Sequence, residues 1–166
     1  MGKFKKLPNR YDIIDGNVAQ VMSQGENPGL YLEAELERNK WFVRELEKQQ
    51  KAEKTNPKKY ETAIKNTREQ MRLINAKLED IKYGTRNFAL FRAEDQVSSI
   101  NREIKQASLP KEMLLRARLK KLKSAIQQIR YDNNQIRRQM HMLGFDKPKS
   151  LKGVTFEEST DTEIKL

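Results

Sequence analysis

The chain has 166 residues, of which 36% are hydrophobic and 34% charged, with a mean hydropathy of −0.92 and a formal net charge of +11. This composition is lean for a thick globular core and suits long helices with narrow apolar stripes. The absence of cysteine and the single histidine, His141, exclude disulfides, a thiol nucleophile and multi-histidine metal sites, and no run approaches the ~18 apolar residues that span a bilayer.

The first ten residues form a basic arm, and the segment after it has the composition of a β-hairpin. Asp15-Gly16 lies between two short β-prone runs within residues 11–21, and glycine readily adopts the positive φ of a tight hairpin turn. The arm lacks the apolar core of a secretory signal. We therefore expect residues 1–29 to form a basic arm plus a β-hairpin, with the arm's cations at Lys3, Lys5, Lys6 and Arg10.

From Leu30 onward the apolar periodicity is helical and is interrupted at three places. Asn56-Pro57 and Gly84-Thr85 each offer an end to one helix and a start to the next, and Pro110 disfavours helical angles at Leu109. The predicted fold class is all-α, with antiparallel coiled-coil hairpins in an elongated four-helix arrangement over residues 30–143. The predicted helices span about 30–54, 58–83, 86–107 and 110–143.

Strict alternation of steps of four and three residues supports the coiled-coil prediction. Leu115, Leu119, Leu122, Ile126 and Ile129 show it in the last helix, where the flanking positions are mostly polar. Two of the predicted seam positions are polar, and a buried asparagine in a seam typically fixes register or oligomeric state. We expect this role for Asn133 and Asn39, the alternative being that each lies in a wet or frayed stretch.

Residues 144–166 show no regular period and contain Pro148, Gly153 and an acidic cluster around Glu157. They are expected to form an extended, partly acidic tail.

The excess positive charge is concentrated in the predicted helix 110–143, which has nine Lys and Arg residues against two acids. One basic residue recurs every seven positions along one flank of the seam, a row roughly 30 Å long at ~1.5 Å per residue. The row is Arg116, Lys123, Arg130 and Arg137, and Arg118, Lys120, Lys121 and Arg138 widen it.

Such a row favours a polyanionic partner, with nucleic acid, DNA or RNA, as the commonest class. Phosphate contacts of this kind are largely independent of sequence, and no base-reading module is recognisable. Two alternatives remain open. Acids on neighbouring helices, such as Glu94, Glu33, Glu47 and Glu61, could neutralise the row, or it could meet a membrane surface. The lack of a broad apolar face argues against a membrane partner.

The aromatic residues form two clusters, Trp41 with Phe42 and Phe88 with Phe91. We expect both to pack against the N-terminal hairpin or against a partner subunit. The alternative for the second cluster, which lies beside Arg86 and Arg92, is stacking on nucleic-acid bases.

No active-site spacing is present in the sequence. There is no phosphate-binding glycine loop, and the residue three before His141 is Arg138, not the glutamate of a di-iron bundle. The expectation is a protein that is not an enzyme and has no cofactor, no metal site and no small-molecule substrate.

Residues 9–19 resemble the small β lead-in of HNH homing-type nucleases, but the histidine-bearing catalytic motif is missing. The basic helical composition is similar to that of protein primers and accessory proteins of small tailed viruses, a likeness that carries over no residue.

The predicted function is therefore that of a non-enzymatic basic coiled-coil protein that binds the nucleic-acid backbone within a nucleoprotein or viral assembly. The alternative is a structural adaptor or virion-assembly component that self-associates or docks a partner helix through its seams. The expected location is inside the cell, under reducing conditions, or in a viral particle.

Overall fold

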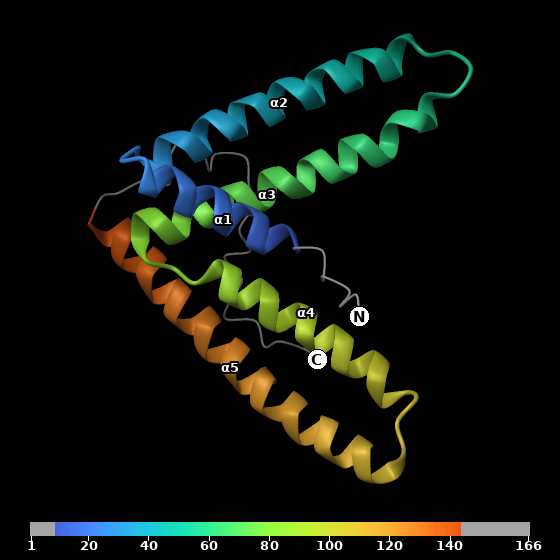
Figure 1. The fold of residues 1–166 in the computed structure, drawn as a ribbon, viewed down its shortest axis with the longest axis vertical. Helices are drawn as coiled ribbons and strands as arrows, with labels where there is room; N and C mark the ends of the chain where they lie inside the picture. Colours follow the sequence, from blue (N-terminus) through green and yellow to red (C-terminus); the bar gives the residue numbers. More distant parts are fainter. Residues whose placement is uncertain (1–8, 144–166) are drawn as a thin grey trace, which may run out of the picture. The chain divides into compact units, whose positions relative to one another are not determined.

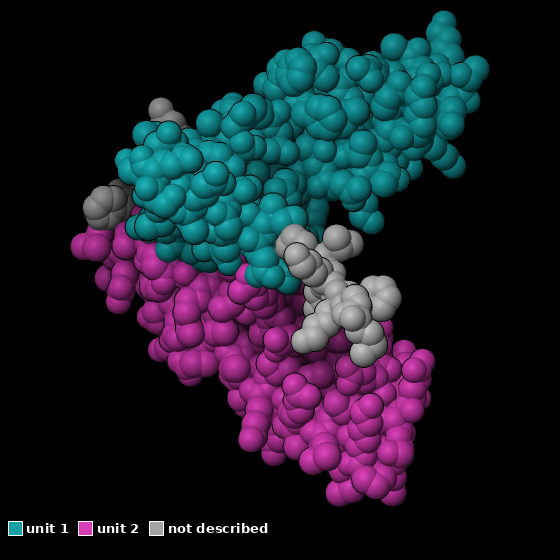
Figure 2. Space-filling view, in the orientation of Figure 1, with its two compact units in different colours: residues 1–82, 149–151 teal, residues 83–148, 152–166 magenta. Residues whose placement is uncertain are grey.

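The computed structural model describes residues 9–143, and every regular element within them is a helix (Figure 1). The all-α prediction is confirmed for this part of the chain. The chain divides between residues 82 and 83 into two compact units, here called unit 1 and unit 2 (Figure 2). This boundary falls inside the segment 30–143 that the sequence analysis takes as one helical region. The elements are α1 (Arg10–Ser23), α2 (Pro28–Ala52), the short 3-10 helix η1 (Pro57–Tyr60), α3 (Glu61–Tyr83), α4 (Asn87–Ile104) and α5 (Leu109–Met142).

The prediction of a β-hairpin over residues 11–21 is wrong, because this segment is helix α1. Its buried residues are Tyr11, Ile14, Val18 and Val21, whose spacing places them on one face of a helix. Gly16 lies inside the helix without a positive φ, so the Asp-Gly pair forms no turn. The burial of a helical apolar face outweighs the local turn preference of two residues.

Helix α1 is capped and tied to α3. The Asn9 side chain accepts a hydrogen bond from the backbone N–H of Asp12 at 2.8 Å. Arg10 pairs with Glu69 at 3.2 Å, and Asp15 pairs with Lys77 at 2.6 Å. From the first pair to the second the residue numbers rise on both helices, so α1 and α3 run in the same direction.

Helices α2 and α3 form an antiparallel pair in unit 1. Glu33 pairs with Lys82 and Glu47 with Arg68, so the numbering rises on one helix as it falls on the other. The predicted range 30–54 is observed as 28–52, because Asn27 accepts hydrogen bonds from the next helical N–H groups and Pro28 occupies the first turn. The predicted range 58–83 is observed as η1 followed by α3.

Near η1, the second half of α2 and the first half of α3 are held together by a small apolar cluster of Val43, Leu46 and Ile64. Tyr60, Ala63 and Met71 pack against it, so the apolar stripes of the two helices face each other.

Unit 2 contains α4 and α5, which also pack antiparallel. Gly84, at φ +78°, supplies the left-handed residue that ends α3 and lets the chain turn toward α4. The predicted ranges 86–107 and 110–143 are observed as 87–104 and 109–142. The core of the unit is a continuous cluster of Ala93, Val97, Ile100, Leu115, Leu119 and Ile126.

None of the helices within residues 9–143 is both long and apolar enough to cross a membrane. The predicted arm residues Lys3, Lys5 and Lys6 and the predicted tail 144–166 lie outside the described residues.

Candidate nucleic-acid interface

The first half of α5 carries the densest cationic surface that the structure describes. Six Lys and Arg residues lie between positions 111 and 123, with Glu112 as the one acid among them. All except Lys123, which is half-buried, are exposed. The buried residues Leu115 and Leu119 fix this half of α5 against α4, so the cations stand on a supported helix. We call this set the α5 basic segment: Lys111, Arg116, Arg118, Lys120, Lys121 and Lys123.

Within residues 9–143, only one member of the α5 basic segment has an ion-pair partner. Arg116 donates to Glu112 from Nε at 3.0 Å and from Nη2 at 2.8 Å. The pair joins residues four apart on one exposed helix face, an arrangement that stabilises a helix by only a few tenths of a kcal/mol. Most of the cationic charge is therefore not neutralised by described residues.

The four cations of the predicted row, which are spaced seven positions apart, do not all lie on one exposed surface. Arg130 pairs with Glu94 of α4 at 2.8 Å, and Arg137 donates to the Asn87 side chain at 3.1 Å. An α-helix turns once every 3.6 residues, so residues seven apart drift by ~20° per step. The drift carries the second half of the row toward α4, and the structure separates Arg130 and Arg137 from the exposed cations.

Arg138, which the sequence analysis places beside the row, is exposed on α5. It lies outside the α5 basic segment, more than two helical turns past Arg130.

Asn133 occupies a polar cluster between α5 and the start of α4. It is 1% exposed, accepts a hydrogen bond from the backbone N–H of Arg86 at 2.9 Å and donates to Asn87 Oδ1 at 3.4 Å. Arg86 also pairs with Asp132 at 3.0 Å. Asn133 thus satisfies an N–H at the beginning of α4, and these contacts lie within one chain.

Asn39 is in a different setting, since it is half-buried and donates to the Glu35 carbonyl of its own helix at 2.7 Å. This bond links two residues of one helix and joins no second element.

The two aromatic clusters also differ. Phe88 and Phe91 are 5% and 8% exposed, and their burial leaves no ring face open for stacking on bases. Trp41 and Phe42 are 58% and 46% exposed on α2.

Of the predicted arm cations, the structure describes Arg10. It pairs with Glu69, and its guanidinium lies 5.3 Å from the ring centre of Tyr11. Arg10 is therefore engaged with unit 1.

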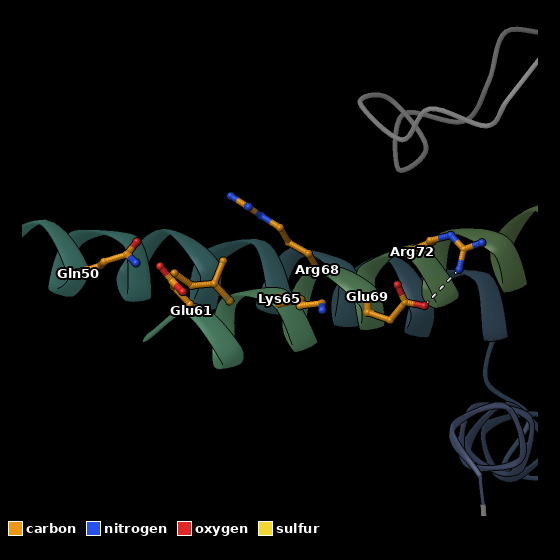
Figure 3. A pocket seen from close by; sticks show the side chains of 7 residues that line it. Gln50, Glu61, Lys65, Arg68, Glu69 and Arg72 are labelled. Carbon is orange, nitrogen blue, oxygen red and sulfur yellow. Dashed lines mark hydrogen bonds and ion pairs between the residues drawn. The ribbon is translucent and has the colours of Figure 1, made fainter. Parts of the chain in front are cut away.

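A shallow, open depression of about 500 Å³ lies on unit 1 along α2 and α3 (Figure 3). Figure 3 shows Glu69 turned toward Arg72, with which it pairs at 3.2 Å. The depression is open and lined by side chains of both charges, so it is a solvated surface on which no catalytic groups converge. Gln50, Glu61, Ile64, Lys65, Arg68, Glu69 and Arg72 line it.

Among residues 9–143, no three acidic or histidine side chains lie close enough to hold a metal ion. The clearest electrostatic perturbation is at Glu53, just after α2. Hydrogen bonds from Thr55 and the ammonium of Lys59, at 3.0 Å, lower the pKa of its carboxyl to about 2. These contacts hold the connection between α2 and η1.

Lys111 is not among the site residues predicted from the sequence, nor are the exposed apolar residues Leu109, Met113 and Leu114. A signal for Lys111 is present in the sequence, because it is the first cation of the predicted helix 110–143 and directly follows Pro110.

Comparison of the chain with known proteins finds no matching family model, no similar curated protein and no similar solved structure.

Proposed function

We propose that this chain is a non-enzymatic helical protein that binds the phosphate backbone of nucleic acid through the α5 basic segment, as part of a larger assembly. The observation that carries the proposal is the set Lys111, Arg118, Lys120, Lys121 and Lys123, none of which has an ion-pair partner among residues 9–143. The segment extends ~18 Å along the helix axis at ~1.5 Å per residue. Double-stranded DNA carries one charge per ~1.7 Å of axis, so several phosphates fall within reach of the exposed surface of this segment.

The proposed interaction is independent of base sequence. Lysine and arginine on a supported helix suit contacts with phosphate oxygens, which position a protein on the polymer without reading bases. The buried Phe88 and Phe91 offer no stacking platform. DNA and RNA backbones are both accommodated by this chemistry.

The finer architecture that accompanies this function is a pair of antiparallel coiled-coil hairpins, α2 with α3 and α4 with α5. The burial of Leu115, Leu119, Ile126 and Ile129, spaced by four, seven and three residues, supports this arrangement. In this architecture the seams are filled within each hairpin, and the cations of α5 remain on the outside.

The test reverses three exposed cations, Arg118→Glu, Lys120→Glu and Lys121→Glu, in one variant. The matched control reverses Lys51, Lys54 and Lys58, which are exposed in unit 1, so both variants change the net charge equally. Binding of labelled duplex DNA and of single-stranded RNA is measured by fluorescence anisotropy over a range of salt concentrations, with circular dichroism to confirm helicity.

We expect the α5 variant to lose affinity for both polymers and the magnitude of its log–log salt slope on duplex DNA to fall by about 0.9 for each phosphate contact that it loses. The control keeps most of the wild-type affinity. Equal losses in the two variants would show that net charge alone is responsible, and unchanged binding by the α5 variant would overturn the proposal.

A further inference from the structure

Helix α2 has a second apolar face on the side opposite its buried one. The buried face consists of Leu32, Leu36, Val43 and Leu46. At 100° per residue, Leu30 and Ala34 each fall within about 20° of Trp41, and all three lie on the side of the helix opposite the buried face. Leu30 is 66% exposed and Trp41 58% exposed, and Phe42 borders them. An exposed tryptophan with the exposed Phe42 next to it in the sequence, and with Leu30 about three turns earlier on the same side of the helix, is typical of a protein–protein contact.

The charges around Trp41 have a symmetry that identifies the partner. Glu37 and Arg44 lie on one edge of the outer face, about 40° and 60° from Trp41, and Arg38 and Glu45 lie at the same angles on the other edge. Each edge therefore carries one acid and one base, on opposite sides of Trp41 along the helix.

We infer that the outer face of α2 binds the same face of a second copy of this chain, with the two helices antiparallel about Trp41. A two-fold axis at Trp41 reverses the direction of the second helix and keeps each edge on its own side. Glu37 of one copy then meets Arg44 of the other, and Arg38 meets Glu45, which gives four opposite-charge contacts per dimer. Trp41 of each copy lies at the centre of the contact.

A parallel arrangement would instead bring opposite edges together, with Glu37 beside Arg38 and Arg44 beside Glu45 of the second copy. The antiparallel arrangement is favoured because it also opposes the two helix dipoles. Helix α2 as a whole has five acidic and five basic residues, so a second copy approaches it without the repulsion expected at α5. Three of these charges already make ion pairs within α2, each between residues three apart: Arg38 with Glu35, Glu37 with Lys40 and Glu45 with Lys48. Glu37 pairs with Lys40 at 3.2 Å within one exposed helix turn, an arrangement that contributes little to stability. Within residues 9–143, Arg44 has no ion-pair partner.

This inference is independent of the proposed function, since it uses no residue of the α5 basic segment. The test uses nuclease-treated full-length protein, with solution mass measured by light scattering and sedimentation over a range of concentrations. Wild-type protein is expected to form a dimer, and Trp41→Ala to raise the dimer Kd at least about tenfold. Tyr131→Ala, which removes another exposed aromatic residue, from α5, is the matched control and is expected to leave the Kd unchanged.

The charge contacts are tested with Glu37→Arg and Arg44→Glu. Each variant alone places like charges together and is expected to be monomeric, whereas a mixture of the two restores attraction at both contacts of this edge and forms a heterodimer. Any one of the following outcomes would overturn the inference. These are a wild-type protein that is monomeric at every concentration, equal effects of Trp41→Ala and Tyr131→Ala, or a mixture that stays monomeric. An increase in mass seen only after an oligonucleotide is added would also overturn it, since the dimer needs no nucleic acid.

Discussion

Replacing Asn133 with alanine tests how the first turn of α4 is held to α5. The side chain makes two intramolecular hydrogen bonds, to the backbone N–H of Arg86 and to Asn87 Oδ1, and is 1% exposed. Each bond contributes about 1 kcal/mol, and its loss leaves the Arg86 N–H without its partner at a helix start. We expect Asn133→Ala to lower the free energy of unfolding by about 2–3 kcal/mol.

Asn39→Ala is the matched control, because Asn39 also lies in a predicted seam but bonds only to a carbonyl of its own helix. Alanine has the higher helix propensity, so the free energy of unfolding is expected to change by less than about 0.5 kcal/mol. Urea unfolding followed by circular dichroism measures both variants, and hydrogen exchange of the Arg86 amide reports the lost bond directly. Equal costs for the two substitutions, or unchanged exchange at Arg86, would refute this account of Asn133.

Three further predictions concern α1, the α2–η1 connection and the core of unit 2. Gly16→Ala should stabilise the protein by about 0.5–1 kcal/mol in thermal unfolding, because Gly16 is helical and a Cβ there meets no atom within 4 Å; a loss of stability would favour a turn at this position. The Glu53 carboxyl should titrate near its pKa of about 2 in carboxyl NMR, and Thr55→Ala should raise that pKa. Because the pKa is lowered by folding, the stability contributed by Glu53 is present above the ordinary pKa of 4.5 and is lost as the pH falls from there toward 2; a Glu53 pKa near 4.5 would contradict the observed contacts. Ile126→Ala should cost about 2–5 kcal/mol in urea unfolding, because Ile126 is fully buried in the α4–α5 core, whereas Leu114→Ala, at a 70% exposed position, should cost under about 0.5 kcal/mol.

The positions of the four long predicted helices could be derived from the sequence because their ends carry strong local signals. Asn27-Pro28, Gly84 and Pro110 each fix a boundary through a cap, a positive φ or a missing N–H. The observed ends differ from the predicted ones by at most three residues. The apolar spacing within each helix then determines which face is buried.

Helix α1 was predicted wrongly because two signals conflict in the same eleven residues. Asp15-Gly16 favours a turn, whereas Tyr11, Ile14, Val18 and Val21 have helical spacing. The helical pattern prevails because its apolar face is buried in the fold, and a local turn propensity carries no information about that burial.

The candidate interface was predictable in part. The concentration of cations on α5 follows from the sequence, but the separation of Arg130 from the exposed cations depends on the position of Glu94 across the helix pair. A heptad assignment treats every seventh residue as equivalent, whereas in a straight α-helix residues seven apart are rotated by ~20° from one another. The role of Asn133 at the start of α4 likewise depends on the register of two helices.

Amide chemical shifts of the isotopically labelled protein, recorded while a short oligonucleotide is added, test the central claim most directly. The proposed interface predicts perturbations centred on residues 111–123 that disappear as salt is raised. Perturbations confined to unit 1, or a spectrum that the oligonucleotide leaves unchanged at low salt, would contradict it.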